Sequence, residues 1–90
     1  MILRIIDRGL TLGQYEALRR ELDIDHKHPL GLIMHGASET EGVMRVAQIW
    51  DSPEYARRFD EELLRPAIEA VGVPTEAEIT VFELQHLVTP

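Results

Sequence analysis

The stretch "GLIMHGASETEGVMRVAQIW", residues 31–50, contains two apolar segments joined by a short polar link. Residues 30–37 and residues 43–50 are rich in apolar and β-branched side chains, which are typical of strands. The sequence "SETEG" at residues 38–42 is typical of a turn. Two strands with so short a connection pair as an antiparallel hairpin, so this stretch places two adjacent strands in the middle of the chain.

The register of this hairpin decides which face His35 occupies. A loop of two or four residues places His35 on the face of Gln48 and Trp50. A loop of three residues places it instead with Arg45 and Ile49. We expect the first arrangement.

The flanking segments supply two helices and two more strands. A strand is predicted over residues 2–6, and a helix follows at residues 11–22, where Thr11 and Gln14 form a capping box. The second helix is predicted over residues 51–72. Asp51 or Ser52 caps it, Pro53 occupies its first position, and Pro66 kinks or restarts it. A last strand is predicted over residues 78–88.

The resulting order, βαββαβ, is that of the ferredoxin-like fold. The fold class is therefore α+β, with two helices covering one face of a four-stranded antiparallel sheet. The 90 residues form a single domain, 1–90.

The other face of the sheet is expected to be buried against a second copy of the chain. The first and last strands are largely apolar on both faces, whereas a free sheet face is mostly polar. We therefore predict a homodimer packed sheet to sheet, with Arg4 and Glu83 as polar partners inside the contact. A Lys in place of Val81 weakens this dimer if Val81 lies on the shared face.

The segment 31–72 resembles a known family. Its "GLIMH" strand, acidic glycine turn, strand ending in Trp, "DSPE" helix start and "LLRP" helix are similar to small bacterial members of the dimeric α+β barrel superfamily, which includes antibiotic-biosynthesis monooxygenase-like proteins. The resemblance extends over nearly all of the chain. It implies a sheet-to-sheet dimer with a pocket between helices and sheet in each protomer. It leaves the reaction open, because the superfamily contains oxygenases, haem-degrading enzymes, isomerases, cyclases and proteins of no known activity.

His35 is the candidate catalytic residue. A neutral imidazole can act as a general base, and Gly36 and Ala37 leave room beside it. The alternative is a buried histidine that only satisfies its own hydrogen bonds in the core.

Three further side chains are candidates for a ligand pocket around His35. Tyr15, on the apolar stripe of the first helix, can present its hydroxyl, and Trp50 can stack on a planar ligand. His86, in step with Phe82 in the last strand, can share the pocket if that face meets the helices. Ordinary core packing is the alternative for Tyr15 and Trp50.

The loop "DIDHKH" at residues 23–28 contains metal-ligand types, but a closed metal site needs three or four converging ligands. We predict that this loop, including His26 and His28, holds no functional metal. The sequence has no glycine-rich phosphate loop, and no axial haem ligand can be singled out, so no cofactor is expected.

The charge and composition narrow the possible partners. The net charge is −7, the nine basic residues are dispersed, and there is no cysteine. Nucleic acid and anionic membranes are therefore poor partners, and disulfide or thiolate chemistry is excluded. We expect a cytoplasmic protein without a membrane span.

These observations lead to two hypotheses. In the first, the chain is a homodimeric enzyme that acts on a small, largely apolar, aromatic or polyketide-like molecule. The reaction is cofactor-free oxygenation, or isomerisation or cyclisation in which His35 moves a proton. In the second, it is a non-catalytic ligand-binding or accessory dimer of the same fold. An enclosed cavity that exposes His35 favours the enzyme, and a packed His35 with both nitrogens satisfied favours the second hypothesis.

Overall fold

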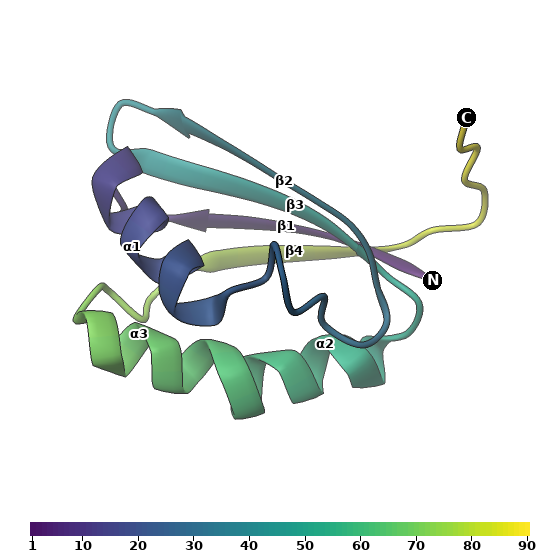
Figure 1. The fold of residues 1–90 in the computed structure, drawn as a ribbon. Helices are drawn as coiled ribbons and strands as arrows, with labels where there is room; N and C mark the ends of the chain where they lie inside the picture. Colours follow the sequence, from purple (N-terminus) through teal and green to yellow (C-terminus); the bar gives the residue numbers. More distant parts are fainter.

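The computed structural model describes residues 1–90, and two helical segments lie on one face of a single sheet (Figure 1). The elements are β1 (Ile2–Arg8), α1 (Leu12–Leu22), β2 (Leu32–Thr40), β3 (Val43–Trp50), α2 (Pro53–Phe59), η1 (Asp60–Leu64), α3 (Arg65–Val71) and β4 (Glu78–Glu83). The sheet order is β2-β3-β1-β4, with all pairs antiparallel. The predicted ferredoxin-like α+β fold is confirmed.

The central hairpin is closed by a two-residue turn. Thr40 pairs with Val43, and the two residues between them, Glu41 and Gly42, both have positive φ, at 51° and 81°. This is the backbone of the tight turns whose twist matches that of the flanking strands, and glycine adopts it without strain. The strands therefore extend further than the predicted turn at residues 38–42 allowed.

The second helix is one continuous rod made of α2, η1 and α3, with a π-helical turn in its middle (Figure 1). The N–H of Arg65 bonds to the carbonyl of Asp60, five residues earlier. Pro66 follows this turn and has no N–H to donate. We predicted a kink or a restart at Pro66, whereas the structure has a widened turn within a continuous helix.

The caps differ between the two helices. The capping box of α1 is confirmed, because Thr11 accepts from the N–H of Gln14 and the Gln14 side chain accepts from the N–H of Thr11. Ser52 occupies the cap position of α2, but its side chain makes no capping hydrogen bond. Pro53 is the first helical residue, as predicted.

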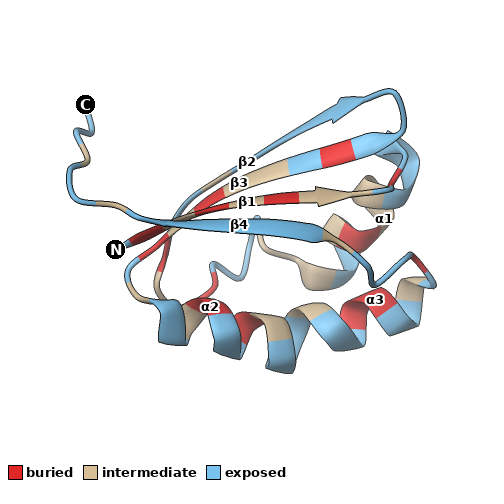
Figure 2. Ribbon diagram, turned by 180° about the vertical axis from the view of Figure 1, so that it is seen from behind, coloured by how far each residue is buried: buried red, intermediate tan, exposed pale blue.

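The core lies between helices and sheet in two clusters (Figure 2). One cluster contains Leu10, Leu18, Met44, Ala67, Ile68 and Val73. The other contains Ile2, Leu32, Trp50, Ala56 and Phe59. β4 is exposed along its whole length, because it is the edge strand beyond the cover of the helices.

Two expectations about the sheet faces were wrong. Arg4 is buried and contacts Asp60 of the long helix, so it lies on the helix-facing side and not in a sheet-to-sheet contact. Val81 and Glu83 are the register partners of Arg4 and Ile2, and cross-strand partners point to the same face. Both therefore also belong to the helix-facing side. An apolar alternation on both faces could not show which face the helices cover.

The last strand is shorter than predicted. β4 ends at Glu83, and the residues after it run as an extended tail away from the body of the molecule (Figure 1). None of the helices has both the length and the apolar character needed to cross a bilayer.

Candidate functional site

A row of three polar side chains crosses the helix-facing side of the sheet. The strand register places His35 of β2 opposite Gln48 of β3, and Gln48 opposite Arg4 of β1. The predicted register of the hairpin, with His35 and Gln48 on one face, is therefore confirmed. Arg4 and Gln48 are both 5% exposed.

The Gln48 amide is held in one orientation by its neighbours. Its Oε1 accepts from Nη2 and Nε of Arg4, at 2.8 and 3.2 Å, and from Nε1 of Trp50, at 2.9 Å. The guanidinium of Arg4 is itself fixed by Asp60, whose two carboxylate oxygens accept at 2.6 and 3.0 Å. Arginine and indole nitrogens only donate, so the amide oxygen must face them. The amide N–H bonds therefore face His35.

This orientation determines the protonation pattern of His35. Nε2 of Gln48 lies 3.4 Å from Nδ1 of His35, and an amide nitrogen can only donate. Nδ1 must then carry a lone pair, and the proton of the neutral ring lies on Nε2. Nε2 of His35 is 2.7 Å from the hydroxyl oxygen of Tyr15, which accepts its hydrogen. The hydroxyl hydrogen of Tyr15 stays free to donate elsewhere.

The surroundings keep His35 neutral. Burial lowers the pKa of His35, the positive charge of Arg19 lowers it further, and Asp25 opposes these effects. Burial also raises the pKa of the Tyr15 hydroxyl. The pair is therefore a neutral imidazole and a neutral phenol over the physiological range.

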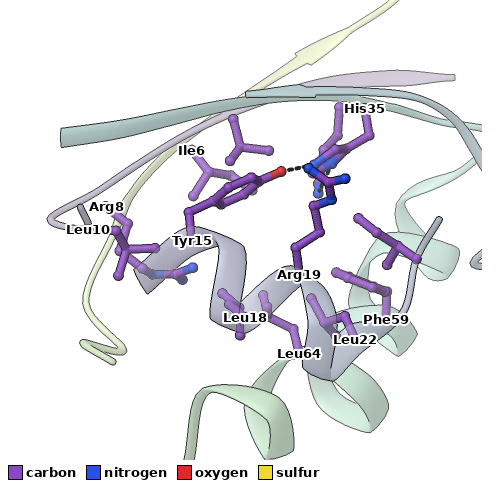
Figure 3. A pocket seen from close by; sticks show the side chains of 13 residues that line it. Ile6, Arg8, Leu10, Tyr15, Leu18, Arg19, Leu22, His35, Phe59 and Leu64 are labelled. Atoms are coloured by element: carbon purple, nitrogen blue, oxygen red, sulfur yellow. Dashed lines mark hydrogen bonds between the residues drawn. The ribbon is translucent and has the colours of Figure 1, made fainter. Parts of the chain in front are cut away.

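His35 and Tyr15 stand between an internal cavity and a surface groove. The cavity has a volume of about 40 Å³ and is lined mainly by apolar side chains from the sheet and helices (Figure 3). The groove outside has a volume of about 370 Å³. His35, Tyr15 and Arg19 line both. The cavity alone has room for only a few water molecules, so a larger ligand must occupy the groove or widen the cavity.

The sequence-predicted pocket residues are only partly brought together. Tyr15 meets His35 directly, as Figure 3 shows. Trp50 is fully buried against Phe59 and does not line the cavity, so it reaches the site only through its hydrogen bond to Gln48. His86 is exposed in the tail beyond β4 and lines neither the cavity nor the groove.

The polar loop at residues 23–28 is held together by pairs. Asp25 accepts from Arg19 at 2.8 Å, and Asp23 contacts the ring of His26 at 2.7 Å. Nε2 of His28 donates to the carbonyl of Leu32 at 2.6 Å. No three histidine, aspartate or glutamate side chains of the chain converge as metal ligands would.

The polar residues behind His35 were not predicted as site residues. Gln48 lies 44 positions and Asp60 lies 56 positions from Arg4 along the chain. Only the strand register and the position of the long helix bring the three side chains together. Their sequence signal was a charged residue at an inward position of an apolar strand, which requires a buried partner.

No protein-family model matches the chain, and no curated protein sequence matches it. Solved structures do resemble it. A proposed antibiotic biosynthesis monooxygenase from Deinococcus radiodurans is 18% identical, with a TM-score of 0.68 over 100% of this chain and 98% of that one. A variant of SnoaB, a cofactor-independent oxygenase from Streptomyces nogalater, is 10% identical, with a TM-score of 0.69 over 99% and 97% of the two chains. A protein of unknown function from Nitrosomonas europaea is 14% identical, with a TM-score of 0.70 over 99% and 93%.

These likenesses extend over whole chains and define the architecture. The protein has the ferredoxin-like α+β fold. More narrowly, its fold is the one seen in these solved structures, among them a proposed antibiotic biosynthesis monooxygenase and a cofactor-independent oxygenase.

Proposed function

We propose that this chain is a homodimeric enzyme that moves a proton on a small, largely apolar, aromatic or polyketide-like molecule, with His35 as the base. The reaction is cofactor-free oxygenation, or isomerisation or cyclisation through an enolate. The observation that supports the proposal best is the pairing of a neutral His35 with Tyr15 at the wall of an apolar cavity.

The two ring nitrogens of His35 have different roles in this proposal. Tyr15 holds Nε2–H at 2.7 Å and orients the ring. Nδ1 faces only the long 3.4 Å contact to Gln48, so it is the atom that accepts the proton. An acidic C–H or O–H of the ligand replaces that contact.

Gln48 then stabilises the anion that is formed. Its amide oxygen stays bonded to Arg4 and Trp50, and its N–H bonds point to the place where the ligand loses its proton. A fixed donor at a developing negative charge lowers the barrier without having to reorganise. All three reaction types begin with this step, and in the oxygenation the resulting carbanion reacts with dioxygen.

Anthrone provides a direct test, because its acidic methylene hydrogens exchange when an enzyme base removes them. The wild type should release deuterium from methylene-labelled anthrone without oxygen. In air it should convert anthrone and one dioxygen to anthraquinone and water. His35→Gln should reduce the exchange rate roughly 10²- to 10⁴-fold, the contribution of a general base. His26→Gln, at an exposed histidine, should leave the rate unchanged.

A second candidate function is a ligand-binding or accessory dimer without catalysis. Both nitrogens of His35 have partners, which was the expectation for this alternative, and the cavity beside His35 is small. Saturable binding of anthrone with no exchange above the rate of the His35→Gln variant would favour it.

A further inference from the structure

A second groove lies between β4 and the long helix. Its volume is about 350 Å³, and it does not include His35 or Tyr15. Arg8 lines both this groove and the cavity. The groove also has apolar walls, which are provided by Ile6, Ile68 and Ile79 among others.

The groove carries more positive charge than its own acids neutralise. Arg4, Arg8 and Arg65 line it together with Asp60 and Glu69. Both carboxylate oxygens of Asp60 are occupied by Arg4. Neither Arg8 nor Arg65 takes part in an ion pair. Two arginines in a protein of net charge −7 are thus left without a carboxylate partner.

Arg8 is the less exposed of these two arginines. It follows Ile2, Arg4 and Ile6 on the helix-facing side of β1, and its Nε is the only buried side-chain nitrogen or oxygen without a hydrogen-bond partner. Burial lowers the pKa of its guanidinium, the nearby charge of Asp60 raises it, and that of Arg4 lowers it. Cations at such positions are ordinarily paired, because an unpaired one destabilises the fold.

We propose that this groove is a second ligand site, in which Arg8 binds the carboxylate of a small acid and the isoleucine walls hold its apolar body. Because Nε of Arg8 is buried, the planar guanidinium donates from its two terminal Nη groups to the two carboxylate oxygens. The body of the acid lies toward Ile68 and Ile79, and Arg65 at the rim adds attraction. The site is separate from the Tyr15–His35 pair and does not depend on the proposed reaction.

Two probes of nearly equal shape test this site, namely 3-phenylpropionate and its neutral amide, 3-phenylpropionamide. The Nε–Hε signal of Arg8 in ¹H–¹⁵N spectra reports on a ligand bound at the Nη groups of the same guanidinium. We expect the carboxylate to shift this signal saturably. The amide should bind roughly 10- to 100-fold more weakly, the factor that charge-assisted hydrogen bonds provide. Equal affinity for the two probes, or no shift with millimolar carboxylate, would overturn the proposal.

The variant Arg8→Met keeps a long apolar side chain and removes the charge. It should bind 3-phenylpropionate no better than wild type binds the amide. Arg20→Met is the matched control, because Arg20 is exposed on α1 and lines neither cavity nor groove. The control should retain the preference for the carboxylate. Loss of the preference in both variants would assign it to net charge alone and contradict a role for Arg8.

Thermal unfolding without ligand gives an independent readout. Because Arg8 lacks a hydrogen-bond acceptor, Arg8→Met should melt at the same temperature as wild type or higher. Residues that serve binding often lower the stability of the unliganded protein. A lower melting temperature with unchanged carboxylate preference would show a purely structural arginine. If these experiments fail while His35→Gln still loses proton exchange, only the second site is refuted.

Discussion

His35 is an imidazole whose protonation is fixed by groups that cannot change their own roles. The amide of Gln48 can only donate toward it, since Arg4 and Trp50 occupy the amide oxygen. The surrounding apolar side chains and the charge of Arg19 both disfavour the imidazolium form. A base of this kind is already deprotonated at neutral pH and needs no activation.

The lowered pKa of His35 predicts how stability depends on pH. Because the unfolded chain binds a proton more readily than the folded one, the contribution of His35 is complete above the unfolded pKa of about 6.5 and is lost as the pH falls through the lower, folded pKa. His35→Gln should remove this acid-side loss. Urea unfolding at several pH values between about 8 and 5 measures it.

His26 provides a control of opposite sign. Its hydrogen bond to the Asp23 carboxylate raises the pKa of His26, so its contribution is present at low pH and is lost as the pH rises through the folded pKa. His26→Asn should leave the acid-side loss in place or steepen it. An acid-side loss that persists unchanged in His35→Gln would show that His35 is not its origin.

Among the elements, the π-helical turn of the long helix is the one that serves the site. It begins at Asp60, whose carboxylate reaches Arg4 from the helix layer. Arg4 in turn holds Gln48. The long helix therefore positions the sheet residues behind His35 without touching His35 itself.

The Arg4–Asp60 pair should be important for stability. Asp60→Asn leaves the buried Arg4 cation without its partner, and breaking such a pair costs about 3–5 kcal/mol. The side chain of Asp60 is 30% exposed, so we expect roughly 2–4 kcal/mol. Asp7→Asn breaks the exposed Arg45–Asp7 pair and should change little. Equal effects of the two substitutions in urea unfolding would contradict the structural role of Asp60.

Much of the element arrangement could be predicted from local sequence signals. The capping box at Thr11 and the apolar runs around the Glu41–Gly42 turn act over a few residues. The first helix and the hairpin both formed, although the hairpin turn is shorter than predicted. The helix-facing side of β1 could not be predicted, because Arg4 is buried by an acid 56 residues away. β4 ends at Glu83, which pairs with Ile2, the first residue of β1, and the apolar run up to residue 88 does not reveal this limit.

At the scale of the whole molecule, one sheet face has no cover within the protomer. Its middle is apolar and its far end carries the Asp7–Arg45 pair. The apolar residues on this face are Leu3, Ile5, Met34, Ala47, Ile49 and Phe82. Exposed apolar surface of this kind indicates a protein contact, and we propose that a second copy covers it.

Phe82 and Val81 offer a matched pair of substitutions. They are adjacent in β4 and 50% and 54% exposed, but Phe82 lies opposite Leu3 on the open face and Val81 lies opposite Arg4 on the helix-facing side. Phe82→Lys should dissociate the dimer at micromolar concentration, and Val81→Lys should not. Sedimentation velocity measures both. A wild type that is a monomer, or a dimer that is disrupted only by Val81→Lys, would contradict the sheet-to-sheet arrangement.

The site itself was predictable only in part. His35 and Tyr15 could be nominated as polar groups on apolar elements, and their contact across 20 residues follows from α1 crossing β2. Trp50 and Gln48 share a face with His35, but which of them lines the cavity depends on packing against Phe59. His86 lies beyond the strand whose length was overestimated.

The most direct measurement is ¹⁵N NMR of histidine-labelled protein over the pH range in which His35 titrates. The proposed mechanism predicts a pyrrole-type Nε2 and a pyridine-type Nδ1 for His35, with a pKa below the ordinary value near 6.5. A proton on Nδ1 in the neutral ring, or a pKa at or above 6.5, would contradict the assignment of Nδ1 as the base.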